Sequence, residues 1–201
     1  MVLHVDDGMM IGKDVEAMNK VLDKMNSKFK ITCKPVSSDP VNYLGMQIKF
    51  ISKGIFLNQS EYVQKMLRRF RCDDINPVYI PIEHGMVTDE ENFVNDEPLS
   101  KLAPYREAVS SFLYLAITSR PDISFCVNYL SRFNNKPMKS HWKMVKRIFQ
   151  CLKVTVAVGI TFSGDRKLVA FSDSDFNGDL GNRKSTSGVL LLRGGPLIWF
   201  T

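Results

Sequence analysis

The chain has 201 residues, of which 44% are hydrophobic and 24% are charged, so it can form one large globular domain or two small ones. No apolar run approaches the roughly 18 residues of a membrane span, and the mixed, acidic N-terminus argues against a signal peptide. The four cysteines and three histidines are scattered, which predicts neither a zinc site nor a disulfide scaffold and favours reduced thiols.

The net charge of +6 is unevenly distributed. Residues 72–100 contain acidic side chains and neither Lys nor Arg, whereas residues 123–164 contain Lys and Arg and no acidic side chain. A basic block of this kind suits a polyphosphate backbone. On charge alone it is equally well explained as the solvated face of a helix, so both interpretations stay open at this point.

The N-terminal half alternates strand and helix patterns. Apolar stretches flank a predicted turn at Asp6-Asp7-Gly8, and a helical period follows with Asp14 placed to cap it. A later hairpin is predicted to turn at 52–54, and Ser60 is a plausible N-cap of the next helix. In order, the expected elements are strands within 2–12, a helix over 14–29, strands over 30–36 and 42–59, and a helix over 60–70.

The C-terminal half begins with an acidic stretch over 89–100 that reads as an exposed linker. Three helices and then three strand regions follow, with turn signals at Asn177-Gly178 and Gly194-Gly195. The helices are expected over 103–119, 121–133 and 140–153, and the strands over 158–164, 167–176 and 186–200. The helical period directs Val63, Phe112, Val145 and Phe149 inward, among others.

Two adjacent carboxylates, Asp6 and Asp7, stand between apolar stretches in LHVDDGMMIG. An isolated aspartate pair most often caps a helix or lies in an exposed turn. Here the flanking strands place both carboxylates at one edge of a sheet, where like charges repel unless a cation lies between them. Because Mg²⁺ prefers carboxylate and phosphate oxygens, the pair and the basic region together indicate two-metal phosphoryl transfer on nucleic acid.

Short motifs along the whole chain occur in the order and spacing of one family. They are HVDD at 4–7, NYLGMQI at 42–48, QSEYVQKML at 59–67, YREAVSSFLYLAITSRPDI at 105–123, HWKMVKRIFQCLK at 141–153 and FSDSDFNGDLGNRKSTSG at 171–188. HVDD resembles the Y-V-D-D box of reverse transcriptases. As a set, the motifs resemble the C-terminal part of the Pol polyprotein of copia-type LTR retrotransposons, where reverse transcriptase runs into RNase H.

The resemblance implies roles for particular residues. Asp6 and Asp7 would be the polymerase carboxylates that hold two metal ions, Mg²⁺ or Mn²⁺. Asp173 would be the first metal-binding carboxylate of the RNase H-like part, and Gly45 would lie in the strand pair that supports the primer end. Basic side chains of the helical region would hold the duplex by its phosphates, and these are Lys136, Lys139, Lys143, Lys146 and Arg147.

The resemblance also implies an α+β fold in four parts. Residues 1–58 would be a palm remnant with the catalytic hairpin and a primer-grip-like hairpin, and residues 59–101 a helix and the acidic linker. Residues 102–156 would form the helical thumb and connection. Residues 157–201 would be truncated RNase H-like strands, in which Asp175 and Asp179 are interpreted as turn residues.

The chain begins at the catalytic hairpin, so we expect the fingers and the strand with the third polymerase carboxylate to be absent, together with most of RNase H. We therefore expect a fragment that is inactive alone and acts with the remainder of Pol. Its partners would be an RNA/DNA template–primer duplex and dNTP, with no membrane, in cytoplasmic virus-like particles or the nucleus. His4 and Ser110 stand where the family has Tyr and Gly.

Two alternatives to the catalytic interpretation stay open. One is a non-catalytic nucleic-acid-binding remnant or domesticated protein, which would bind duplex without Asp6 and Asp7. The other is a decayed reading frame without function, which would show weak cooperativity on unfolding and no duplex preference.

Overall fold

The computed structural model describes residues 1–33, 40–83, 86, 96–165, 167–176 and 184–201. Its elements are β1 (Val2–His4), β2 (Asp7–Met9), α1 (Val15–Asn26), β3 (Val41–Tyr43), β4 (Met46–Ile51), β5 (Gly54–Asn58), α2 (Ser60–Arg69), α3 (Tyr105–Thr118), η2 (Pro121–Ile123), α4 (Ser124–Ser131), α5 (Lys139–Val154), β6 (Gly159–Phe162), β7 (Leu168–Ser174), β8 (Ser187–Arg193) and β9 (Pro196–Phe200). Helices and antiparallel sheets occupy largely separate stretches of the chain, which confirms the α+β class that the sequence predicts.

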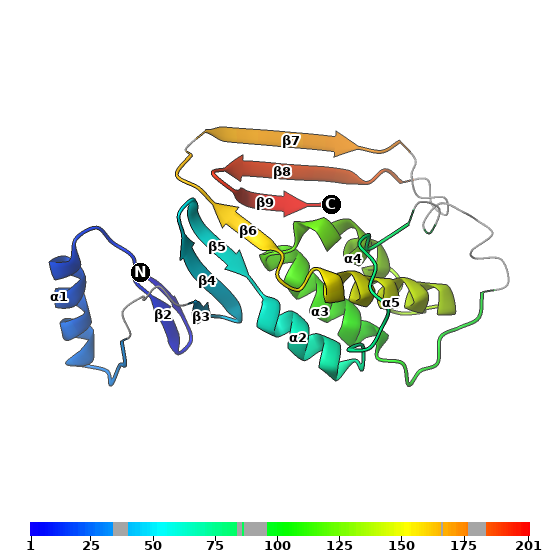
Figure 1. Ribbon diagram of the computed structural model, residues 1–201, viewed down its shortest axis with the longest axis horizontal. Helices are drawn as coiled ribbons and strands as arrows, with labels where there is room; N and C mark the ends of the chain where they lie inside the picture. The colour runs from blue at the N-terminus through cyan, green and yellow to red at the C-terminus, as the bar shows by residue number, and fades with distance from the viewer. Residues whose placement is uncertain (34–39, 84–85, 87–95, 166, 177–183) are drawn as a thin grey trace.

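The helices α2 to α5 form the hydrophobic core (Figure 1). Val63, Phe112, Val145 and Phe149 come from three of these helices, and each is at most 2% exposed. The ring of Phe149 lies 4.6 Å from that of Phe112 and 5.0 Å from that of Phe70, between centroids. Burying a side chain of this size contributes about 1.5–3 kcal/mol, so these contacts hold the helices together. The inward positions are those that the helical period predicts.

A buried arginine fastens the end of α3 to the end of α5. Arg120 is 1% exposed. Its guanidinium donates to both carboxylate oxygens of Asp122, at 2.9 and 2.7 Å, and to Oγ1 and the carbonyl oxygen of Thr155, at 2.8 and 3.1 Å. Bidentate pairing of this kind offsets the cost of burying the charge. Sequence reasoning missed the contact because Arg120 and Thr155 are 35 residues apart.

The first large sheet is antiparallel, with the order β3-β4-β5-β6. Its β4–β5 hairpin turns at Ser52-Lys53, within the predicted turn, whereas the turn at Leu44-Gly45 between β3 and β4 was not predicted. β6 follows α5 in the chain but pairs with β5. The first strand of the range 157–201 therefore extends the sheet of residues 41–58, and the helices lie in the chain between two paired strands.

The second large sheet is a meander with the order β7-β8-β9. Gly194 takes a φ of +69° at the turn before β9, where the Gly194-Gly195 pair predicts one. The indole N–H of Trp199 donates to the carbonyl oxygen of Ala116 at 2.6 Å, so β9 lies against α3 (Figure 1). The turn predicted at Asn177-Gly178 lies outside the described residues.

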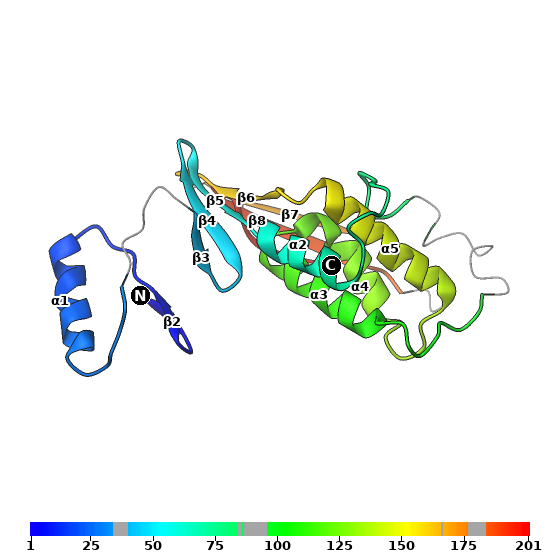
Figure 2. The same cartoon turned by 60° about the horizontal axis from the view of Figure 1, so that its bottom comes forward.

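The β1–β2 hairpin and α1 lie at one end of the molecule, away from α3, α4 and α5 (Figures 1 and 2). As predicted, α1 follows an Asp14 cap, whose Oδ1 accepts the backbone N–H of Ala17 at 3.0 Å, but α1 has no buried residue. Of the strand predicted over 30–36, residues 30–33 form none and 34–36 lie outside the described residues. None of the described helices combines the length and apolarity that crossing a bilayer requires.

Candidate functional site

The β1–β2 hairpin presents the two adjacent carboxylates. Its register pairs His4 with Asp7, so Val5 and Asp6 form the turn and Asp7 begins β2. The turn predicted at Asp6-Asp7-Gly8 therefore begins one residue too late and ends two residues too late, because the ladder takes Asp7 and Gly8 into the strand. Both carboxylates are exposed at the hairpin tip.

Val5 holds an unusual backbone conformation beside these carboxylates. Its φ is +52°, a region that β-branched residues rarely adopt. Two-residue hairpins favour positive φ in the turn because it matches the twist of the strands. The side chain of Val5 is exposed, so packing does not offset the strain. Strain of this kind is concentrated at functional sites, which makes the tip the leading candidate for chemistry.

The donor set at the tip suits a divalent cation only in part. Mg²⁺ binds commonly through one or two carboxylates together with substrate phosphates and water, and Asp6 and Asp7 supply two carboxylates on neighbouring residues. Over the described ranges, no three His, Cys, Asp or Glu side chains are grouped so that they could hold a metal ion. The hairpin therefore fits an ion that takes its remaining ligands from a phosphate substrate, from water or from another chain segment.

Asp173 lies in a different sheet from the hairpin. It faces Gly188 near the C-terminal end of β7, is exposed, and its Oδ1 accepts the backbone N–H of Ser174 at 2.9 Å. Asp175 extends the same ladder, since its Oδ1 accepts the N–H of Thr186 at 2.6 Å and its N–H donates to the Thr186 carbonyl. Asp179 lies outside the described residues.

Gly45 lies in the two-residue turn between β3 and β4, where Leu44 and Gly45 take φ values of +50° and +74°. The hydroxyl of Tyr114, in α3, donates to the carbonyl oxygen of Leu44 at 2.5 Å. A Cβ added to Gly45 would lie 3.2 Å from the same hydroxyl, so glycine leaves room for this contact. Tyr114 therefore docks the turn on α3. Sequence reasoning found Gly45 and missed Tyr114, whose partner is 70 residues away.

The predicted basic residues gather at α5 and its N-terminal approach. Lys139, Lys143 and Lys146 are exposed on successive turns of α5, and Lys136 is exposed just before it. Arg147 is half-buried and forms an ion pair with Glu83, while Lys139 forms one with Glu97. Sequence reasoning placed these acidic residues in or beside a linker and missed that they reach the basic helix.

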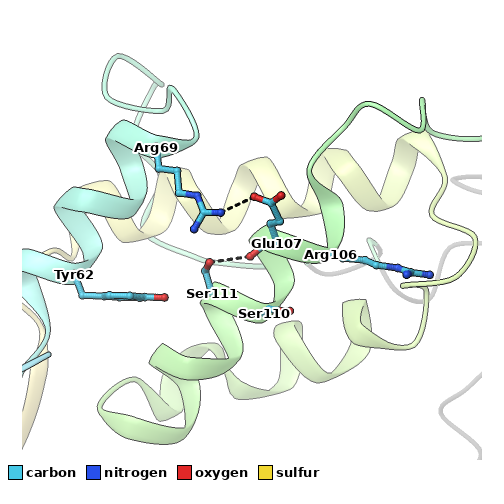
Figure 3. Close-up of a pocket in the computed structure, with 6 residues that line it drawn as sticks. All are labelled: Tyr62, Arg69, Arg106, Glu107, Ser110 and Ser111. Carbon is cyan, nitrogen blue, oxygen red and sulfur yellow. Dashed lines mark hydrogen bonds and ion pairs between the residues drawn. The ribbon is translucent and has the colours of Figure 1, made fainter. Parts of the chain in front are cut away.

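A shallow groove of about 430 Å³ lies between α2 and α3 and is lined by Tyr62, Arg69, Arg106, Glu107, Ser110 and Ser111 (Figure 3). Arg69 and Glu107 bridge it with a 2.7 Å ion pair. Figure 3 shows Arg106 directed away from this pair, and its guanidinium donates to the Asn134 carbonyl at 2.7 Å. None of these lining residues was singled out from the sequence as a binding residue.

Burial holds several ionisable core side chains neutral. Burial raises the pKa of the Cys126 thiol to about 12 and raises the pKa of Tyr105 well above its usual value. Burial lowers the pKa of His141, with a smaller opposing effect from Asp96. These groups therefore belong to the core and are not candidates for the site.

Known proteins include relatives that align with nearly the whole chain. Residues 1–84 match the family model described as reverse transcriptase (RNA-dependent DNA polymerase). The chain is 31% identical over 206 residues to the retrovirus-related Pol polyprotein from transposon TNT 1-94 of Nicotiana tabacum, covering 99% of this chain and 15% of that protein. It is 31% identical over 203 residues to the Pol polyprotein from transposon RE1 of Arabidopsis thaliana, covering 99% of this chain and 13% of that protein.

A third relative is much shorter. The secreted RxLR effector protein 161 of Plasmopara viticola is 41% identical over 102 residues, which cover 49% of this chain and 72% of that protein. No solved structure matches the chain.

Proposed function

Because the chain belongs to the reverse transcriptase family of copia-type retrotransposon Pol polyproteins, we propose that it forms part of an RNA-directed DNA polymerase with RNase H. The observation that carries the proposal is the β1–β2 hairpin, which places Asp6 in the turn beside the strained Val5 and Asp7 at the start of β2, within the residues that match the family model. The chain spans about 15% of the length of such a Pol polyprotein, so the hairpin acts together with the remainder of Pol.

Asp6 and Asp7 would hold Mg²⁺ or Mn²⁺ in this polymerase. When bound in a two-metal site, the ions stabilise the negative charge that develops as the primer 3′-hydroxyl attacks the α-phosphorus of dNTP and pyrophosphate leaves. The exposure of both carboxylates at the hairpin tip leaves them accessible to the triphosphate and to the primer end. The pairing of His4 with Asp7 across the hairpin fixes the backbone that carries both carboxylates.

The four parts expected from the sequence become assignments within this proposal. Residues 1–58 act as the palm, residues 59–101 as a helix and acidic linker, residues 102–156 as thumb and connection, and residues 157–201 as RNase H-like strands that contribute Asp173. The bond from Tyr114 to the Gly45 turn supports a thumb that moves together with the primer-grip-like hairpin. The pairing of β6 with β5 means that the last part shares a sheet with the first.

The exposed basic residues near α5 would hold the phosphates of the RNA/DNA template–primer duplex. Three exposed lysines lie in α5 or just before it, namely Lys136, Lys143 and Lys146. Each lysine that neutralises a phosphate releases a counterion. Binding should therefore weaken steeply as salt concentration rises.

Primer extension on a template–primer duplex with Mg²⁺ or Mn²⁺ tests the catalytic part of the proposal. The isolated chain should give no extension above background, since its described residues group no third carboxylate with the hairpin. Joined to the remainder of Pol, it should extend the primer, and Asp6→Asn with Asp7→Asn should reduce the rate at least about 100-fold.

Each other outcome has a defined meaning. Extension by the joined protein that the double substitution leaves unchanged would refute the catalytic role of the pair. Extension by the isolated chain that the double substitution abolishes would keep that role and refute the need for the remainder of Pol.

A second candidate is duplex binding without catalysis. It is favoured by the packing of the molecule, since the basic helix α5 belongs to the buried helical core while the β1–β2 hairpin lies apart from it. Fluorescence anisotropy with a labelled duplex should then give the same affinity for the wild type and the Asp6→Asn/Asp7→Asn variant. Loss of binding in that variant would count against this candidate.

A further inference from the structure

Two described stretches of the acidic region, 73–83 and 96–99, lie along α5, and we call them the acidic strap. Along the C-terminal half of α5, each of the following contacts uses a backbone group of the strap. Lys153 Nζ donates to the Ile75 carbonyl at 3.0 Å, the Val78 N–H donates to the Gln150 carbonyl at 3.4 Å, and the Cys151 thiol donates to the Tyr79 carbonyl at 3.5 Å. The strap therefore follows the helix and does not project into solvent as a linker would.

The strap also holds the N-terminal turn of α5. The backbone N–H of Lys139 donates to the Glu97 carbonyl at 2.9 Å, and its ammonium pairs with the Glu97 carboxylate. Asp96 accepts the backbone N–H of Ser140 at 3.2 Å and also the Ser140 hydroxyl. A carboxylate at this end of the helix is stabilised by unpaired N–H groups and by the helix dipole.

Glu83 pairs with Arg147 at the middle of α5. The arginine side chain is 15% exposed, whereas the glutamate side chain is 55% exposed. Two of the five predicted phosphate-binding residues, Lys139 and Arg147, are thus paired with strap carboxylates. Among the residues that the structure describes, no carboxylate forms an ion pair with Lys143 or Lys146.

We propose that the acidic strap is an autoinhibitory element that competes with duplex phosphates for the basic face of α5. This inference rests on the proposed duplex binding and names how that binding is regulated. Ion pairs whose carboxylates are exposed to solvent are weak, whereas a duplex offers many phosphates and releases counterions. The duplex first meets Lys143 and Lys146, and displacement of the strap then frees Lys139 and Arg147.

The full chain tests this competition through the salt dependence of duplex affinity. The variant Glu83→Gln/Asp96→Asn/Glu97→Gln keeps side chains of the same shape and removes the charge of the three strap carboxylates that contact α5. For a labelled 20-base-pair RNA–DNA hybrid, we expect about 10-fold tighter binding than wild type at about 100 mM salt. The slope of log affinity against log salt should steepen by about two, because two more cations become available. The matched control Glu16→Gln/Asp23→Asn/Asp165→Asn removes the same charge from exposed sites outside the strap and should leave the slope unchanged.

Hydrogen exchange on the wild-type chain gives a second test that needs no variant to fold. Binding of the hybrid should speed exchange of the backbone N–H groups of Val78, Leu99 and Lys139, which bond between the strap and α5 or, for Leu99, between the strap and Pro137 just before α5. Unchanged exchange at all three positions in the bound complex would overturn the competition.

The outcomes separate this inference from the function on which it rests. If wild type binds and Lys143→Ala/Lys146→Ala abolishes binding, but the strap variant binds no tighter than the control, the competition alone is refuted. If neither wild type nor the strap variant binds the hybrid, the proposed duplex binding is refuted and the competition with it.

Discussion

The helical core and the N-terminal hairpin differ in how their side chains meet solvent. Phe149 of α5 is 1% exposed and lies between other aromatic rings, whereas Leu3 of β1 is 60% exposed. No residue of α1 is buried either. The core residues therefore contribute mainly to the stability of the fold, whereas two carboxylates and a strained turn of the hairpin are exposed to solvent. Substitutions in the core should therefore change the free energy of unfolding strongly, and substitutions in the hairpin should change it little.

The sharpest test of this comparison is a cavity in the core. Phe149→Ala should lower the free energy of unfolding by about 3–5 kcal/mol, because it removes a large buried ring and leaves a void. Urea unfolding followed by circular dichroism measures the change. The matched substitution Leu3→Ala in the exposed hairpin should cost less than about 1 kcal/mol. Equal losses in the two variants would contradict the division between core and hairpin.

Breaking the Arg120 contact should have the next largest effect. Arg120→Met keeps an apolar stem of similar length but leaves Asp122 and Thr155 without their buried donor, which should cost about 2–3 kcal/mol. The cost stays below that of a fully buried pair because the Asp122 side chain is 45% exposed. Arg106→Met, on the exposed side of α3, is the control and should cost less than about 1 kcal/mol. Thermal unfolding of both variants compares them.

Tyr114→Phe tests the contact between the core and the Gly45 turn. Loss of the hydroxyl leaves the Leu44 carbonyl without its donor from α3, so stability should fall by about 1 kcal/mol. Tyr62→Phe is the matched control, since Tyr62 packs edge-on against Tyr114 at 5.0 Å between ring centroids. Because Tyr62→Phe keeps the ring contact and removes only a hydroxyl, a loss as large as that in Tyr114→Phe would contradict a specific role for the hydrogen bond to Leu44.

The smallest effect should come from the protonation of His141. Burial lowers its pKa in the folded chain, and the nearby Asp96 partly opposes this shift. Its Nδ1 accepts the backbone N–H of Met138 at 3.1 Å, and its ring stacks on Phe133. The unfolded chain therefore binds the proton more readily than the folded chain does.

The resulting pH dependence has a definite sign. The contribution of His141 to stability is fully present above the unfolded pKa of about 6.5 and is lost as pH falls toward the lower folded value. Urea unfolding between about pH 7.5 and pH 5 should show this loss. A His141→Gln variant should show a flatter pH profile, and a profile as steep as that of wild type would assign the loss to other groups.

Local features of the fold could be predicted from the sequence. The Asp14 cap, the inward positions of α2, α3 and α5, and the pair at Asp6 and Asp7 depend on residues close together in the chain. The turn of the first hairpin lies at Val5-Asp6, and the predicted turn shares only Asp6 with it. The sequence marks Gly8 as the turn residue, whereas the ladder puts Val5 at positive φ, which its β-branched side chain disfavours.

Most helices and strands follow from the sequence pattern, because periodicity and capping act over a few neighbouring residues, and the same pattern singles out the carboxylates and lysines of the proposed site. Contacts between distant segments are visible only in the folded molecule. It brings Tyr114 to the Gly45 turn, β6 to β5, and Glu83 to Arg147. These contacts depend on how the packed core places segments that are tens of residues apart, and no local pattern encodes that arrangement.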